Sequence, residues 1–198
     1  MLIELAPAPG GALPVQEFRA HLRLGSGFGD DAAQDALLES YLRAALAAIE
    51  GRIGKALLSR GFVWRIEAWR EAAEQRLPVA PVAAVEELRL LDRAGAGLVV
   101  EATRYRLVPD HHRPRIVAAG AVLPAIPPGG AVEIRFTAGF GPAWSDLPVD
   151  LAQAVLLLAG QYYETRHETG AGAGAIPFGV MALIERWRTV RVLGGGGR

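Results

Sequence analysis

Residues 131–166 decide the fold, and their sequence is AVEIRFTAGFGPAWSDLPVDLAQAVLLLAGQYYETR. The first part alternates the apolar side chains of Val132, Ile134 and Phe136 with polar ones, which is the period of a half-buried strand. The second part is a long run of helix-forming residues. A strand followed closely by a long helix predicts an α+β fold.

The predicted helix of this stretch is apolar on nearly every side. Ser145 or Asp146 is expected to cap it, and Pro148 is expected in its first turn. Leu156 and Leu157 point away from its main apolar stripe. A helix of this kind is buried on several sides or lies at a subunit interface. These two leucines are therefore candidates for contacts between subunits.

Two helices are expected before the β region. A short one begins at Pro14, and Asp30 and Asp31 place negative charge at the start of the next, where a helix dipole favours it. The polar face of this second helix carries Asp35 and Glu39, which are further candidates for subunit contacts. The acidic helix contrasts with a basic C-terminal segment, and unlike charges at the two ends suit head-to-tail contacts or two different partners.

The middle of the chain predicts several strands separated by turns. Apolar residues alternate with polar ones, or come in short runs, at 62–66, 88–90, 98–100, 105–107 and 116–117. The expected organisation is a main domain at 1–168 with helical parts at 14–60 and 146–168 and a β insertion at 62–138, then a glycine-rich flexible linker at 169–175 and a C-terminal segment at 176–198.

The C-terminal segment combines apolar residues at helical spacing with arginines. Because the glycine linker tethers it, we expect it to contribute little to the core of its own chain and to dock on another protein. Trp187 is either the anchor of that interface, which we favour, or part of a local core. The candidate docking residues are Phe178, Val180, Leu183, Ile184, Trp187, Arg188 and Arg191.

Composition excludes several function classes. The 198 residues carry 21 basic and 21 acidic side chains and no cysteine. Thiol catalysis and thiolate metal sites are therefore excluded, and there is no basic excess for non-specific nucleic-acid binding. No apolar run approaches the ~20 residues of a membrane helix, and no secretory signal is evident. We expect a protein made in the cytoplasm, with no membrane partner.

One short motif offers an alternative chemistry. His111 and His112 follow Asp110 in a predicted turn, so a small metal-binding protein or enzyme could use them. Adjacent residues point in different directions, and a metal site needs more convergent ligands. We therefore favour a solvated turn, and we predict no catalytic residue, no metal ligand and no cofactor. Metal analysis of the purified protein separates the two hypotheses.

Several short motifs occur in an order that resembles the head–tail connector, or adaptor, proteins of tailed phages and of phage-derived gene transfer particles. The similarity covers most of the chain, although Gln16 stands where a Ser or Thr is expected and the glycine linker is long. The motifs are Pro14-Val15 with residues 17–23, Asp30-Asp31 with residues 49–52 and Ala56-Leu57, Leu77-Pro78 with Pro81-Val82 and Val85, residues 136–140 with Leu147-Pro148, Ala154, Tyr162, Glu164 and Arg166, and Pro177-Phe178-Gly179 with Leu183 and Arg188.

The resemblance implies a structural role without enzymatic activity. It implies a fold that is an α-helical bundle with an inserted antiparallel β region and a tethered C-terminal helix. Such proteins form a ring, commonly of twelve copies, at the head–tail junction. The ring joins the portal protein to the next tail or stopper protein and lines part of the channel through which DNA passes. The resemblance also implies that the C-terminal segment docks on the portal. An adaptor in an unrelated complex is the remaining alternative, and neighbouring portal and capsid genes would exclude it.

Overall fold

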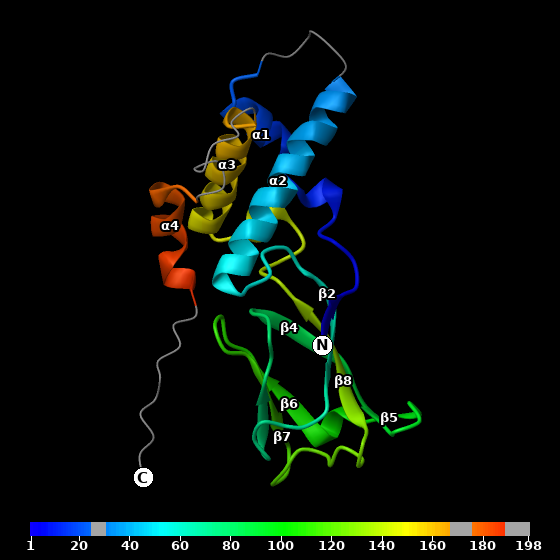
Figure 1. Cartoon of the computed structure of the whole chain (residues 1–198). Coiled ribbons are helices and arrows are strands. Elements are labelled where there is room, and N and C mark those ends of the chain that lie inside the picture. Colours follow the sequence, from blue (N-terminus) through cyan, green and yellow to red (C-terminus); the bar gives the residue numbers. More distant parts are fainter. Residues whose placement is uncertain (25–30, 167–175, 189–198) are drawn as a thin grey trace.

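The computed structural model describes residues 1–24, 31–166 and 176–188, with helices at one end of the molecule and two β-sheets at the other (Figure 1). The helices are α1 (Val15–His21), α2 (Asp31–Ile53), α3 (Val149–Glu164) and α4 (Phe178–Ile184), and the 3-10 turns are η1 (Gly10–Ala12), η2 (Ala102–Arg104), η3 (Trp144–Asp146) and η4 (Glu185–Trp187). The strands are β1 (Leu2–Glu4), β2 (Arg60–Ile66), β3 (Glu74–Arg76), β4 (Val82–Leu91), β5 (Gly97–Val99), β6 (Tyr105–Val108), β7 (Arg115–Ala118) and β8 (Ala131–Ala138). The predicted fold class is confirmed.

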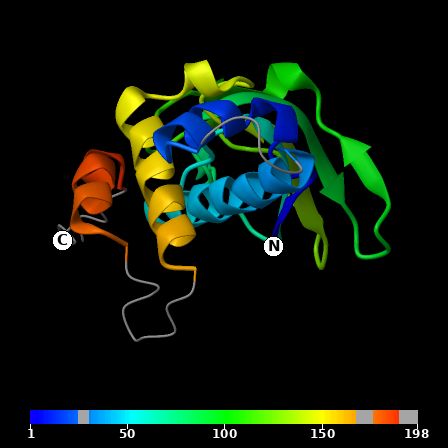
Figure 2. The same cartoon turned by 90° about the horizontal axis from the view of Figure 1, so that it is seen from above.

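The helical end has its own hydrophobic core. The apolar stripe of α2 is fully buried at Leu38, Leu42, Ala45 and Ile49, as its spacing predicts. These side chains pack with α1 and α3, and Figure 2 shows α3 between α2 and α4. No helix in the described ranges is long and apolar enough to span a membrane.

A second core lies between the two sheets. One sheet has the strand order β1-β2-β8-β4-β5, and the other has the order β3-β7-β6. The alternating residues Val132, Ile134 and Phe136 of β8 are fully buried, which confirms the predicted strand. Phe62 of β2 lies opposite Phe136 in the antiparallel register, and their rings stack with centroids 5.6 Å apart. Aromatic pairs of this kind help to fix strand register.

Helix α2 ends at Ile53, because Gly54 adopts a left-handed conformation (φ +68°) that ends the helix. The predicted cap of the third helix is wrong. Pro148 is the N-cap of α3, and the carboxylate of Asp146 instead accepts a hydrogen bond from the backbone N–H of Ala143, 2.9 Å away. Asp30 lies outside the described residues.

The residues before α1 also contribute to the β region. They begin with β1, which pairs with β2 and adds an edge strand to the larger sheet. The sheet region therefore combines strands from Arg60 to Ala138 with one strand from outside that interval.

The chain enters and leaves the β region at one point. The backbone N–H of Ser59 donates to the carbonyl of Gly141 (2.8 Å), and that of Phe140 donates to the carbonyl of Leu57 (2.9 Å). Gly139 lies between these bonds with φ +138°, and a Cβ atom there would come within 2.4 Å of the Ser59 backbone. Only glycine fits this close approach without strain.

Candidate functional site

The C-terminal helix packs on its own chain. Val180 and Ile184 of α4 are buried against α3 and complete the helical core. The expectation that this segment contributes little to the core of its chain is therefore wrong. The physical reason is the surface of α3, whose apolar side chains extend around the helix and need cover on the side away from α2.

Trp187 fixes the end of this segment. Its indole N–H donates to Oδ2 of Asp150 in the first turn of α3 (2.7 Å), and Arg186 Nε lies 2.7 Å from the same oxygen. The Trp187 ring meets Phe140 edge to face, with centroids 5.3 Å apart, and stacks on His112 at 6.4 Å. Of the two roles left open for Trp187, the structure supports the local one for this chain.

The other predicted docking residues are divided between core and surface. Phe178, at the start of α4, is 89% exposed, whereas Leu183 is only partly exposed. Arg188 forms an ion pair with Glu185 at 3.0 Å. Arg191 and the predicted linker at 169–175 lie outside the described residues. The outward face of α4 therefore presents Phe178 as its main apolar group.

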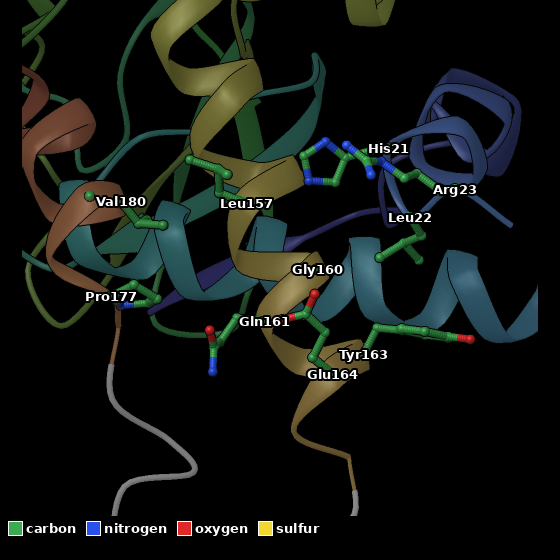
Figure 3. Close-up of a pocket in the computed structure, with 11 residues that line it drawn as sticks. His21, Leu22, Arg23, Leu157, Gly160, Gln161, Tyr163, Glu164, Pro177 and Val180 are labelled. Carbon is green, nitrogen blue, oxygen red and sulfur yellow. The ribbon is translucent and has the colours of Figure 1, made fainter.

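A groove runs beside α4, and sequence reasoning missed it. It has a volume of about 510 Å³ and lies between the end of α1, the C-terminal half of α3 and the start of α4 (Figure 3). Its walls combine apolar Leu22, Leu157 and Val180 with polar His21 and Glu164. Such a surface suits the side chain of a protein partner better than a small molecule, because the groove is open to solvent. No local signal in the sequence brings α1 beside α4.

The residues predicted for subunit contacts have partners within the chain. Asp35 pairs with Arg19 of α1 at 2.5 Å, and Glu39 pairs with Arg43 at 2.7 Å. Leu156 and Leu157 are partly buried and pack against the helical core, and Leu157 also lines the groove.

The turn with His111 and His112 is held by hydrogen bonds and ring contacts. The Asp110 carboxylate accepts the backbone N–H groups of His112 (2.6 Å) and Arg113 (2.7 Å), which lowers its pKa. The His111 ring stacks on Phe140, with centroids 6.0 Å apart. Both histidine side chains therefore pack against aromatic rings. Among the residues that the structure describes, no three His, Asp or Glu side chains come together as a metal site.

The only lysine of the protein is buried beneath this turn. Lys55 is 2% exposed, and its Nζ donates to the backbone carbonyl of His111. Burial lowers the pKa of Lys55 to about 8, against an opposing contribution from the charge of Asp110. Lys55 therefore ties the end of α2 to the turn on which Trp187 packs. The one feature of the sequence that distinguishes Lys55 is that the chain has no other lysine.

A buried ion pair joins the helices to the larger sheet. Arg60 at the start of β2 donates to Glu50 of α2 (2.6 Å) and to Glu4 of β1 (2.7 Å). The side chains of Arg60 and Glu50 are about one-tenth exposed. Each charge therefore offsets the desolvation cost of burying the other.

Three solved structures of particles contain a chain similar to this one. In each case the similarity covers 98% of this chain and 98% of the matched chain. The neck of an empty gene transfer agent (GTA) particle, computed with C6 symmetry, has a chain that is 67% identical with a TM-score of 0.89. The virion of a native GTA particle has one that is 67% identical with a TM-score of 0.86, and the neck of a native GTA particle, computed with C12 symmetry, has one that is 63% identical with a TM-score of 0.85. No protein-family model and no curated protein matches the chain.

The α+β architecture, the docked C-terminal helix and this similarity over the whole chain agree with one class of protein, a component of the neck of phage-like particles. The chain belongs to the head–tail connector family of gene transfer agent particles.

Proposed function

We propose that this protein is a structural head–tail connector that forms a ring in the neck of a phage or phage-like particle. The observation that carries the proposal is the 67% identity, over 98% of both chains, with a chain in the neck of a gene transfer agent particle. The protein joins the portal protein to the next tail or stopper protein and acts without enzymatic chemistry. It is made in the bacterial cytoplasm and works at the head–tail junction, where DNA passes through the ring in transient contact with it.

The ring consists of twelve copies. The support is the symmetry of the neck structures that contain similar chains, C6 in one and C12 in another. A ring of identical copies is built from a head-to-tail contact in which each copy uses two different surfaces. The zero net charge of the chain suits assembly, because copies of a protein without net charge do not repel one another over long distances.

The portal docks on the outward face of the C-terminal segment. Phe178 supports this proposal because its ring is 89% exposed at the start of α4, and aromatic side chains are frequent anchors of protein interfaces. The buried residues Val180 and Ile184 hold α4 in place, so their part in docking is to orient the helix. The groove between α1, α3 and α4 lies beside Pro177 and offers a recess for a side chain of the portal.

Replacing Phe178 with Asp tests the docking proposal. The side chain is outside the core, so the thermal unfolding temperature should stay within about 2 °C of wild type. A matched control is Val122→Asp, which places the same charge at an exposed position of a loop in the β region. In cells that produce particles, Phe178→Asp protein should be lost from purified particles in immunoblots, and electron micrographs should show filled heads without tails.

Two results would contradict the proposal. If Phe178→Asp protein enters particles as efficiently as the control and tails attach normally, α4 does not provide the docking surface. If the wild-type protein is absent from purified particles, the connector role itself is wrong. Deletion of residues 176–198 is a weaker test, because it would also uncover the apolar side of α3.

A further inference from the structure

The exposed apolar residues of the described chain concentrate on the two edges of the larger sheet. At the β1 edge, Leu2 is 41% exposed and Ile3 is 43% exposed, and at the β5 edge Leu98 is 70% exposed and Val99 is 51% exposed. The flanking residues Met1 and Leu5 are also exposed. Other large exposed apolar residues, such as Val122 and Val149, occur singly on separate elements, which is ordinary for a protein surface.

Both edges are open for backbone pairing. Within the part of the chain that the structure describes, the strand order is β1-β2-β8-β4-β5, and there β1 pairs only with β2 and β5 pairs only with β4. Natural proteins protect an edge by keeping it short or by adding charged residues, proline or a cover. Both edge strands are short, but neither contains lysine or proline, and the one charged side chain, Glu4 of β1, is paired with Arg60. Figure 1 shows β5 projecting from the body of the molecule.

The charged side chains on the two edge strands and directly opposite them are paired inside the chain. Glu4 of β1 pairs with Arg60, and Arg89, which lies opposite Val99, pairs with Glu87 at 2.9 Å. The N-terminal ammonium of Met1 donates to the carbonyl of Arg65 (2.7 Å). Along the two strands, an approaching strand would therefore meet mainly apolar side chains and backbone groups. This surface chemistry fits another sheet edge of the same composition.

The direction of the strands allows each edge to meet the other edge of a second copy. Every neighbouring pair in the sheet is antiparallel, and four such reversals separate β1 from β5. The two edge strands therefore run in the same direction. A rotation about an axis roughly along the strands preserves that direction, and it can place β5 of one copy beside β1 of the next in parallel.

We propose that the subunits of the ring join through their sheet edges, with β5 of one copy paired to β1 of its neighbour. The proposal rests on the proposed ring, because a head-to-tail contact needs two different surfaces on each copy, and these edges provide them. Each strand is only three residues long, so one joint supplies few hydrogen bonds. The contact is accordingly weak between two free copies and gains strength when the ring closes.

Cysteine cross-linking in particles tests the pairing directly, because the chain has no cysteine of its own. A variant with both Leu2→Cys and Leu98→Cys is treated with a short bis-maleimide, and the products are separated on a denaturing gel. We expect a ladder of covalent oligomers that extends to the complete ring. Each single variant should stay monomeric, because a head-to-tail contact does not bring a residue close to its own copy. The control pair is Leu2→Cys with Val122→Cys, which should give no ladder.

The outcomes separate this inference from the proposed function. If the double variant is present in purified particles but stays monomeric, or if the control pair gives an equal ladder, the edge pairing is wrong while the connector role stands. Dimers from either single variant would indicate a two-fold contact and would also overturn it. Absence of the protein from particles that contain the other neck proteins would overturn both proposals.

A charge introduced at the β1 edge gives an independent test of the pairing. Ile3→Lys adds a charge to the β1 edge, and Val122→Lys adds the same charge elsewhere. Both proteins should unfold at the wild-type temperature, since both positions are exposed. In the cysteine background, Ile3→Lys should abolish the ladder and Val122→Lys should leave it intact. A ladder that persists in Ile3→Lys would contradict the pairing.

Discussion

The buried amine of Lys55 makes the stability of this protein depend on pH in a way that one substitution removes. Its pKa falls from the usual 10.5 to about 8 in the folded chain because burial disfavours the charge. Each pKa unit corresponds to ~1.4 kcal/mol, so keeping this amine charged in the folded protein costs about 3 kcal/mol below pH 8. Lys55→Met removes the cost, and it also loses the hydrogen bond to His111, which contributes about 1 kcal/mol.

The sign of the pH effect follows from the two pKa values. Between pH 8 and 10.5 the unfolded chain holds a proton on Lys55 that the folded chain has lost, so stability rises with pH in that window. From pH 7 to pH 9.5 the wild type should therefore gain about 2 kcal/mol relative to Lys55→Met. At pH 7 the variant should be the more stable protein by about 1–2 kcal/mol.

Urea unfolding of both proteins at pH 7 and pH 9.5 measures this difference. Because Lys55 is the only lysine, tyrosines and other groups that titrate in this range are common to both proteins and cancel in the comparison. The reasoning is refuted if the two free energies of unfolding change in parallel between the two pH values. A variant less stable than wild type at pH 7 would show that the hydrogen bond to the turn outweighs the buried charge.

Four further substitutions test the structure by urea unfolding at pH 7. Arg60→Met should cost about 3–5 kcal/mol because it leaves Glu50 charged and buried without its partner, whereas Arg188→Met, at an exposed pair, should cost at most about 1 kcal/mol; equal losses would contradict the role given to burial. Gly139→Ala should cost more than about 3 kcal/mol, since its Cβ would clash with the backbone, and a wild-type midpoint would refute that geometry. Gly51→Ala should stabilise by up to about 1 kcal/mol, since it lies inside α2 with open space around it; a loss of stability would contradict this.

The sequence was sufficient to predict an element wherever its apolar residues recur with a regular helix or strand spacing. Val132, Ile134 and Phe136 alternate so regularly that β8 was predictable, and the spacing of Leu38 and Leu42 was enough for the buried face of α2. Helix ends were predicted less well. Asp146 has the chemistry of a cap, but its carboxylate bonds to a 3-10 turn before α3, and a local pattern does not distinguish the two.

The site was harder to predict because it depends on contacts between distant residues. The apolar and basic character of the C-terminal segment was evident, but Val180 and Ile184 are buried because α3 lacks cover on one side, and that is a property of the assembled helices. The bond from Trp187 to Asp150 spans 37 positions and has no counterpart in local periodicity. The same holds for the groove, whose walls come from three helices.

The adjacent entry and exit of the β region has a consequence for how such proteins can vary. Residues 60–138 leave and rejoin the helical end beside one another, through the bonds of Ser59 to Gly141 and of Phe140 to Leu57. A related chain could therefore carry a different β segment at this place without a change in the path of the helices. The external requirements of this segment are the facing strand β1, the Glu50 carboxylate that pairs with Arg60, and Lys55 and Trp187, which contact the His111–His112 turn, so these groups and the segment must change together.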